Sequence, residues 1–298
     1  MAEATPYQPR WQAYFVLTKP RVVALMLLCA LVGMLLAQDA STVISLQLVI
    51  VALLGIALVA GSAAVVNHVA DAHIDAKMAR TEDRPIPSGR LTTNQGLVFA
   101  AVLAVAGFLI LFYLVNPLTA WLNLASWIGY AVVYTLWLKH ATAQNIVIGG
   151  LFGAAPPLFG WTAVTGNIAL EPILLVLIIF LWTPPHFWSL ALARIEDYER
   201  SSVPMLPTTK GIVHTKWQIL LYIVLLVLCT LVLPVLEFAG LLYIVLALAL
   251  GCFFIYLGVS MITRNDDTLY MFMFKYSILY LGLLFTALLA DHYLELLI

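Results

Sequence analysis

The sequence predicts an all-α, polytopic membrane protein: one domain, residues 1–298, folded as a bundle of nine transmembrane helices. Hydrophobic residues make up 63% of the chain and its mean hydropathy is +1.02, beyond the range of soluble domains. Charged residues make up only 10%, and they are concentrated in a few segments between long apolar runs. Each run is long enough to cross a bilayer, which takes about 20 residues of α-helix.

The nine apolar runs follow one another along the chain, each of roughly 17 to 25 residues. They start near Val22, Val43, Gly96, Pro117, Asn145, Glu171, Trp217, Ala239 and Leu269. Two of them contain proline pairs, Pro156–Pro157 and Pro184–Pro185. Proline removes a backbone donor, and a membrane tolerates that loss only where neighbouring helices or a wet cavity supply partners. We therefore expect both pairs, and His186 beside the second, to face the bundle interior.

Lysine and arginine set the orientation. All 14 fall in segments that a nine-helix bundle places on one side: residues 10–21, 77–90, 139, 194–216 and 264–275. The segments on the other side carry only acids: Asp39, Glu171, Glu237, Asp291 and Glu295. The positive-inside rule then puts the N-terminus, with the segment 1–21, in the cytoplasm and the C-terminus outside. The net charge of −1 gives no reason to expect a nucleic-acid partner.

The most polar stretch of the chain is "NHVADAHIDAKMARTEDRPIPSGR", residues 67–90. Asn67, Asp71 and Asp75 are spaced four apart at the end of the second apolar run, so they share one face of a helix. Two carboxylates so close repel each other unless a cation lies between them, and Mg²⁺ takes such oxygen ligands together with phosphate. Basic residues just downstream are suited to bind that phosphate: Lys77, Arg80, Arg84 and Arg90. A solvated loop is the simpler alternative, which the regular spacing disfavours.

A second polar stretch, "HFWSLALARIEDYERSSVPMLPTTKG", repeats the order of apolar helix, acids, basic residues and proline-containing loop. A parallel repeat of four-helix units would bring both loops to one end of the bundle. We therefore predict that residues 71–95 and 194–216 are cytoplasmic loops that close over a single active site.

The chain resembles the UbiA superfamily of intramembrane prenyltransferases over nearly its whole length. The Asn-xxx-Asp-xxx-Asp element is typical of the superfamily, whereas "TPPHFW" and "DYERSSVPMLP" resemble the branch that prenylates haem. Three further segments are part of the resemblance: "TKPRVV", "RPIPSGR" and "YTLWLKHATAQNIVIGGLFGAAPPLFGW". The resemblance implies that Mg²⁺ helps farnesyl diphosphate to ionise and that a vinyl group of haem B captures the farnesyl cation. Addition of water then gives haem O for terminal oxidases.

The resemblance also assigns roles to residues. Asn67, Asp71 and Asp75 are expected to hold Mg²⁺, with Asp197 a further catalytic or metal-binding candidate. Many superfamily members carry a second Asp-xxx-Asp pair, but this chain reads "RIEDYER", so a second Mg²⁺ there stays open. Five basic residues are candidates for binding diphosphate: Arg80, Arg84, Lys139, Arg194 and Lys210.

Haem contacts are the least specific prediction. The candidates are His68, His73, His186 and Tyr198, and Trp182 and Trp188 are aromatic rings that could stack on a porphyrin. Haem B would be a substrate that leaves, since the sequence contains no CxxCH attachment motif. The other implied partners are membrane lipid and a downstream haem A synthase or oxidase assembly factor. The implied location is a bacterial cytoplasmic (inner) membrane.

Three alternatives remain at this stage. A related prenyltransferase acting on a quinone precursor would share the first acidic site but should show a second aspartate pair. A secondary transporter would also have acids and broken helices, but its charges belong near the membrane midplane. A non-catalytic oxidase assembly factor would have no need of carboxylates in helical register.

Overall fold

The computed structural model describes residues 10–39, 43–76, 81–201, 204–264 and 266–296. Every regular element within these ranges is a helix, which confirms the all-α prediction for this part of the chain. The first part comprises α1 (Arg10–Leu17), α2 (Pro20–Leu36), α3 (Leu46–Asp75), α4 (Thr93–Leu114), α5 (Pro117–Trp127), the π-helix η1 (Ile128–Leu138) and α6 (Lys139–Ala141). The second part comprises α7 (Asn145–Gly153), α8 (Pro156–Thr165), α9 (Leu170–Ala193), α10 (Ile195–Ser201), α11 (Leu206–Lys210), α12 (Ile212–Thr230), α13 (Val232–Val235), α14 (Leu241–Thr263) and α15 (Thr268–Leu296).

Local sequence explains where several of these helices begin. The Ser45 hydroxyl accepts a hydrogen bond from the Leu48 amide at the start of α3. Thr92 and Gln95 form a reciprocal capping box at the start of α4. Asn116 caps α5, with Pro117 in the first turn, where its missing N–H costs nothing.

Seven helices, counting α7–α8 and α12–α13 as single segments, are long and apolar enough to cross a membrane. The pair α1 and α2, bent by 49°, would make an eighth span. Helices α5 and η1 follow each other without a break over residues 117–138, but neither reaches spanning length alone. The described structure thus shows a multi-pass membrane protein, and the count of nine crossings stays a prediction.

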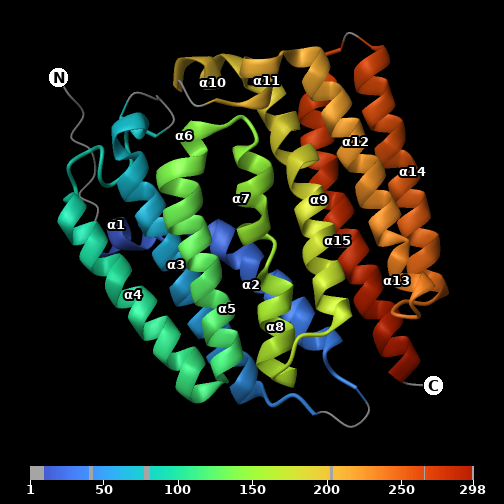
Figure 1. Ribbon diagram of the computed structural model, residues 1–298, viewed down its shortest axis with the longest axis horizontal. Coiled ribbons are helices and arrows are strands. Elements are labelled where there is room, and N and C mark those ends of the chain that lie inside the picture. Colours follow the sequence, from blue (N-terminus) through green and yellow to red (C-terminus); the bar gives the residue numbers. More distant parts are fainter. Residues whose placement is uncertain (1–9, 40–42, 77–80, 202–203, 265, 297–298) are drawn as a thin grey trace.

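The helices pack in two groups. On one side α3 runs along α4, and α2 crosses α8; on the other, α9, α12, α14 and α15 surround the largest cluster of buried apolar side chains. Figure 1 shows the short helices α6, α10 and α11 together at one end of the bundle, with α13 and the C-terminus at the opposite end. The end that carries α6, α10 and α11 is the one that the sequence predicts to be cytoplasmic.

The two proline pairs behave differently. Pro156 and Pro157 occupy the first turn of α8, and the chain bends out of helical hydrogen bonding at Ala154–Ala155 before them. Pro184 and Pro185 lie inside α9, which continues through them, and both are buried. The prediction that the pairs lie inside the bundle is confirmed, because all four prolines are buried.

Candidate active site

The last turns of α3 carry the centre of the site. Asn67, Asp71 and Asp75 lie on one face of this helix, as the spacing predicts, and they are only 4%, 5% and 5% exposed. Carboxylates so deeply buried are stable only when positive charge or hydrogen-bond donors compensate them. The structure supplies one cationic side chain to each of the three residues.

The three cations come from separate parts of the chain. Lys139 Nζ lies 2.6 Å from Asp71 Oδ2, and Arg84 Nη1 lies 2.6 Å from Asp75 Oδ2. Lys19 Nζ donates a hydrogen bond to the side-chain oxygen of Asn67. The structure therefore places Arg84 and Lys139, two of the predicted diphosphate-binding residues, against the predicted metal ligands.

Lys19 is a site residue that sequence reasoning missed. It forms the joint between α1 and α2 and has a φ of 50°, in the left-handed region that non-glycine residues rarely adopt. This conformation costs about 1 kcal/mol or more. The signal in the sequence was the charge of "TKPRVV" directly before an apolar helix, which by itself looks like a membrane-interface anchor.

The π-helix η1 forms the wall opposite α3. Asn67 Nδ2 donates to Thr135 Oγ1 over 3.3 Å, and Thr135 Oγ1 donates to the Tyr130 carbonyl over 2.8 Å. The Tyr130 and Tyr134 rings stack with their centroids 5.3 Å apart. Gly149 of α7 leaves room for Tyr134, because a Cβ there would overlap the tyrosine ring. Short π-helical segments are frequent at functional sites.

The residues present fit a magnesium ion. Asp71 Oδ1 is buried and has no hydrogen-bond partner, so it offers a lone pair to a cation without breaking an existing contact. In the part of the chain that the structure describes, no three His, Cys, Asp or Glu side chains are grouped so that they could hold a metal ion together. A metal bound here would therefore have two carboxylates, an amide oxygen and exogenous ligands, which is a donor set typical of Mg²⁺ with phosphate.

The second predicted loop lies at the same end but is open to solvent. Arg194 and Asp197 are exposed at the junction of α9 and α10, and Lys210 is exposed at the end of α11. Among the described residues, no hydrogen bond or ion pair joins these three to Asp71 or Asp75. The structure thus brings the two loops to one end, with Arg194, Asp197 and Lys210 apart from the two carboxylates.

Asn145 connects the second loop to the end of η1 and was not predicted. Its side-chain Nδ2 donates to the carbonyls of Lys139, at 3.2 Å, and Pro204, at 3.0 Å, while its Oδ1 is buried without a partner. Tyr198, a candidate haem contact, lies half-buried on α10. Arg80, another predicted diphosphate ligand, lies outside the described residues, as does Lys77.

The three candidate haem-binding histidines differ in accessibility. His68 on α3 is buried, and its Nδ1 has no hydrogen-bond partner. His73 is exposed near the end of the same helix, and His186 is partly buried where α9 packs against α15. Trp188, one of the rings expected to stack on a porphyrin, is completely buried in the apolar core, which leaves it no free face.

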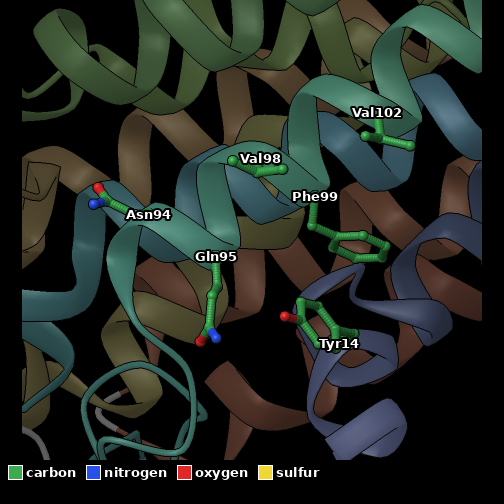
Figure 2. A pocket seen from close by; sticks show the side chains of 6 residues that line it. All are labelled: Tyr14, Asn94, Gln95, Val98, Phe99 and Val102. Carbon is green, nitrogen blue, oxygen red and sulfur yellow. The ribbon is translucent and has the colours of Figure 1, made fainter.

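A shallow surface pocket of about 420 Å³ lies between α1 and α4, away from all these residues. Figure 2 shows the Tyr14 and Phe99 rings facing each other in it; their centroids are 4.9 Å apart. It is lined by Tyr14, Asn94, Gln95, Val98, Phe99 and Val102. It contains none of the predicted site residues.

Comparison with known proteins decides the family. Residues 26–279 match the sequence profile of the UbiA prenyltransferase family. The chain belongs to the UbiA prenyltransferase family. It is 54% identical over 284 residues to the protoheme IX farnesyltransferase of Shewanella oneidensis, an alignment covering 95% of this chain and 94% of that protein. It is 54% identical over 289 residues to protoheme IX farnesyltransferase 1 of Pseudomonas fluorescens, covering 97% and 96%.

Solved structures of other proteins show the same fold. A digeranylgeranylglyceryl phosphate synthase superposes with a TM-score of 0.81 at 18% identity, covering 95% of this chain and 98% of that one. A UbiA homologue from Archaeoglobus fulgidus bound to DMAPP and Mg²⁺ gives a TM-score of 0.67 at 14% identity, covering 92% and 98%. These structures confirm the fold of the family member described here.

Proposed function

We propose that this chain transfers the farnesyl group of farnesyl diphosphate to a vinyl group of protohaem IX, with addition of water, and so forms haem O and diphosphate. The haem acceptor rests on the names of the bacterial relatives at 54% identity, which favour it over a quinone precursor or a transported solute. The observation that carries the chemistry is the buried face of Asn67, Asp71 and Asp75, with a cation beside each residue.

Asn67, Asp71 and Asp75 are the residues that would hold Mg²⁺, with Asp197 a further candidate. A bound Mg²⁺ supplies Lewis-acid stabilisation of the charge that develops on a departing diphosphate. Lys19, Arg84 and Lys139 already surround this face, so their ammonium and guanidinium groups are positioned to neutralise the phosphate oxygens. As the C–O bond of the substrate breaks, the diphosphate keeps the electron pair and the allylic cation is left beside the apolar interior.

The second loop, residues 194–216, is proposed to cover the active site. Arg194, Asp197 and Lys210 are exposed at the same end of the bundle, and Asn145 fixes the loop at Pro204 to the end of η1. We propose that Arg194 and Lys210, together with Arg80, contact the diphosphate when both loops close. Closure excludes water, which would otherwise capture the allylic cation.

The topology follows the charge distribution. We infer nine crossings: the seven long segments, the bent pair α1–α2 and the continuous run α5–η1. The N-terminus is then cytoplasmic and the C-terminus outside, in a bacterial cytoplasmic membrane. Farnesyl diphosphate, haem B and lipid are the partners there, and a haem A synthase or an oxidase assembly factor would receive the product.

The test is a product assay with purified protein in detergent, haem B, farnesyl diphosphate and Mg²⁺, followed by chromatography and mass spectrometry. We expect a hydroxyethylfarnesyl haem that disappears with a chelator and in Asp71→Asn. Asp291→Asn is the matched control, since Asp291 is also a buried aspartate, 6% exposed, but belongs to the last turns of α15, next to the C-terminus at the opposite end (Figure 1). Prenylation of a phenolic acid in place of haem would overturn the haem acceptor. If farnesyl diphosphate stays intact with every acceptor, the proposal that this chain transfers a prenyl group would be overturned.

A further inference from the structure

An aromatic ring stacks on each face of the His186 imidazole. The Trp182 ring lies parallel to it on one side, with centroids 4.2 Å apart and an interplanar angle of 20°. The Phe274 ring of α15 covers the other side, at 4.5 Å and 29°. Trp182 is itself fixed, since its indole N–H donates to the Ser277 carbonyl over 2.7 Å. A ligand can therefore reach the imidazole only at its edge, beside the Phe187 ring, which lies at 5.2 Å and 86°.

The hydrogen-bond network assigns the tautomer of this ring. His186 Nδ1 lies 2.7 Å from Ser277 Oγ, and Ser277 Oγ donates its one hydrogen to the Phe274 carbonyl, also over 2.7 Å. The hydroxyl can then only accept from the imidazole, so Nδ1 carries the hydrogen. The other ring nitrogen, Nε2, therefore has a free lone pair.

Nε2 of His186 is only partly enclosed. It makes no hydrogen bond to the described residues, and it is not one of the buried polar atoms that lack a partner. An imidazole lone pair left unpaired at membrane depth is costly, and binding a ligand there would remove that cost. A histidine whose Nδ1–H donates to a fixed acceptor while Nε2 stays free is the usual arrangement of a metal-binding imidazole.

We propose that His186 Nε2 is the axial ligand of the substrate haem iron and that Ser277 is the positioning residue that fixes its tautomer. This rests on the proposed function, because it presumes a haem substrate. An Fe–N bond lies in the imidazole plane and along the porphyrin normal, so the macrocycle stands perpendicular to the ring. Trp182 and Phe274, parallel to the imidazole, then present their edges to the porphyrin; Trp182 would not stack on it as the sequence suggested.

The position of His186 relative to the acidic face agrees with this role. On α7, an added Cβ at Gly149 would meet Tyr134 of η1, and one at Gly150 would meet Thr183 of α9, three residues before His186. Adjacent residues of α7 thus join the wall of the acidic site to the helix that carries His186. This keeps the proposed haem ligand near the site of the diphosphate, as transfer between the two substrates requires.

The experiment is a titration of the full-length protein in detergent with ferrous haem B, followed by absorption and resonance Raman spectroscopy. We expect an iron–histidine stretching band in the wild type that is lost in His186→Ala and is restored by added imidazole. His73→Ala is the matched control and should keep the band. An unchanged iron–histidine band in His186→Ala would overturn the assignment.

Ser277→Ala tests the positioning role without removing the ligand. It should weaken haem binding about 10- to 100-fold and shift the iron–histidine stretch to lower frequency, because the imidazole loses its acceptor. Binding of farnesyl diphosphate should not change. An unshifted band and unchanged haem affinity would overturn the role of Ser277.

Wild-type protein that makes farnesylated haem while His186→Ala keeps the band would refute only this inference. Wild-type protein that neither binds nor modifies haem B would refute the proposed function itself.

Discussion

At the scale of single residues, the site contains more positive than negative charge. Asp71 and Asp75 contribute two negative charges, and Lys19, Arg84 and Lys139 contribute three positive ones. A divalent cation alone would raise this excess and would compete with Lys139 and Arg84 for carboxylate oxygens. Metal together with diphosphate would cancel it, since the basic side chains could move from carboxylate to phosphate. The two ligands should therefore bind cooperatively.

Lys139→Met tests this coupling. Without diphosphate, Mn²⁺ as a probe of the Mg²⁺ site should bind roughly tenfold more tightly, because the metal no longer displaces an ammonium group whose charge-assisted bond contributes about 1.5 kcal/mol. With metal present, inorganic pyrophosphate should bind at least about tenfold more weakly. Isothermal calorimetry with each ligand measures both effects, and Lys19→Met should behave similarly. Lys275→Met, at an exposed lysine on α15, is the control. Weaker Mn²⁺ binding in Lys139→Met would refute the competition.

Sequence periodicity predicts neighbours within one helix and little beyond it. Asn67, Asp71 and Asp75 were predictable because a four-residue spacing keeps side chains on one face whatever the tertiary structure. Lys19 was not, because its approach to Asn67 depends on the joint between α1 and α2 and on how α2 packs against α3. Asn145 was missed for a similar reason: its side chain bonds two backbone carbonyls, and any residue type can supply a carbonyl.

At the scale of elements, the π-helix η1 is the element that the sequence did not predict. The run beginning at Pro117 predicts an ordinary α-helix, whereas residues 128–138 close hydrogen bonds five residues apart. This wider turn changes which side chains share a face, so a 3.6-residue pattern misplaces Tyr134, Thr135 and Lys139 relative to one another. The position of η1 in turn depends on close approach to α7.

Two glycines of α7 form a matched pair for testing this dependence. Gly149→Ala should push Tyr134 away and move η1, and a displacement of about 1 Å can reduce turnover roughly 100-fold. Gly153→Ala should be nearly neutral, because nothing lies within 4 Å of the added Cβ. The measurement is kcat in the product assay, with thermal unfolding followed in parallel. Equal activity in the two variants would show that the register of η1 does not set the site.

At the scale of the whole molecule, the end opposite the site is closed by α15. Asp291 Oδ2 accepts hydrogen bonds from the Gly240 amide and, at 3.3 Å, from the Tyr243 amide, so it caps α14 from another helix. His292 Nε2 lies 2.9 Å from the Gln38 carbonyl at the end of α2. The last helix thus contacts the end of α2 at this end of the bundle, while the predicted active-site loops lie at the other end.

Asp291→Ala should therefore reduce stability and leave the chemistry intact. Loss of a helix cap costs about 1 kcal/mol, and more where the amides are buried, so the midpoint of thermal unfolding in detergent should fall by several degrees. Turnover per folded molecule, measured well below that midpoint, should match the wild type. A large loss of kcat with unchanged thermal stability would show that this end takes part in the reaction.

The separation of these two ends also predicts how the molecule lies in the membrane. The described lysines and arginines lie in the end segments predicted to be cytoplasmic, and both predicted active-site loops share that end, so in the proposed topology farnesyl diphosphate approaches from the cytoplasm. Alkaline phosphatase fused after Ile298 should be active and green fluorescent protein there should be dark, because the proposed topology places the C-terminus outside. The same reporters fused after Arg90 or Lys210 should give the opposite pattern. A fluorescent C-terminal fusion would contradict this orientation, because the C-terminus and the active-site loops lie at opposite ends of the bundle (Figure 1).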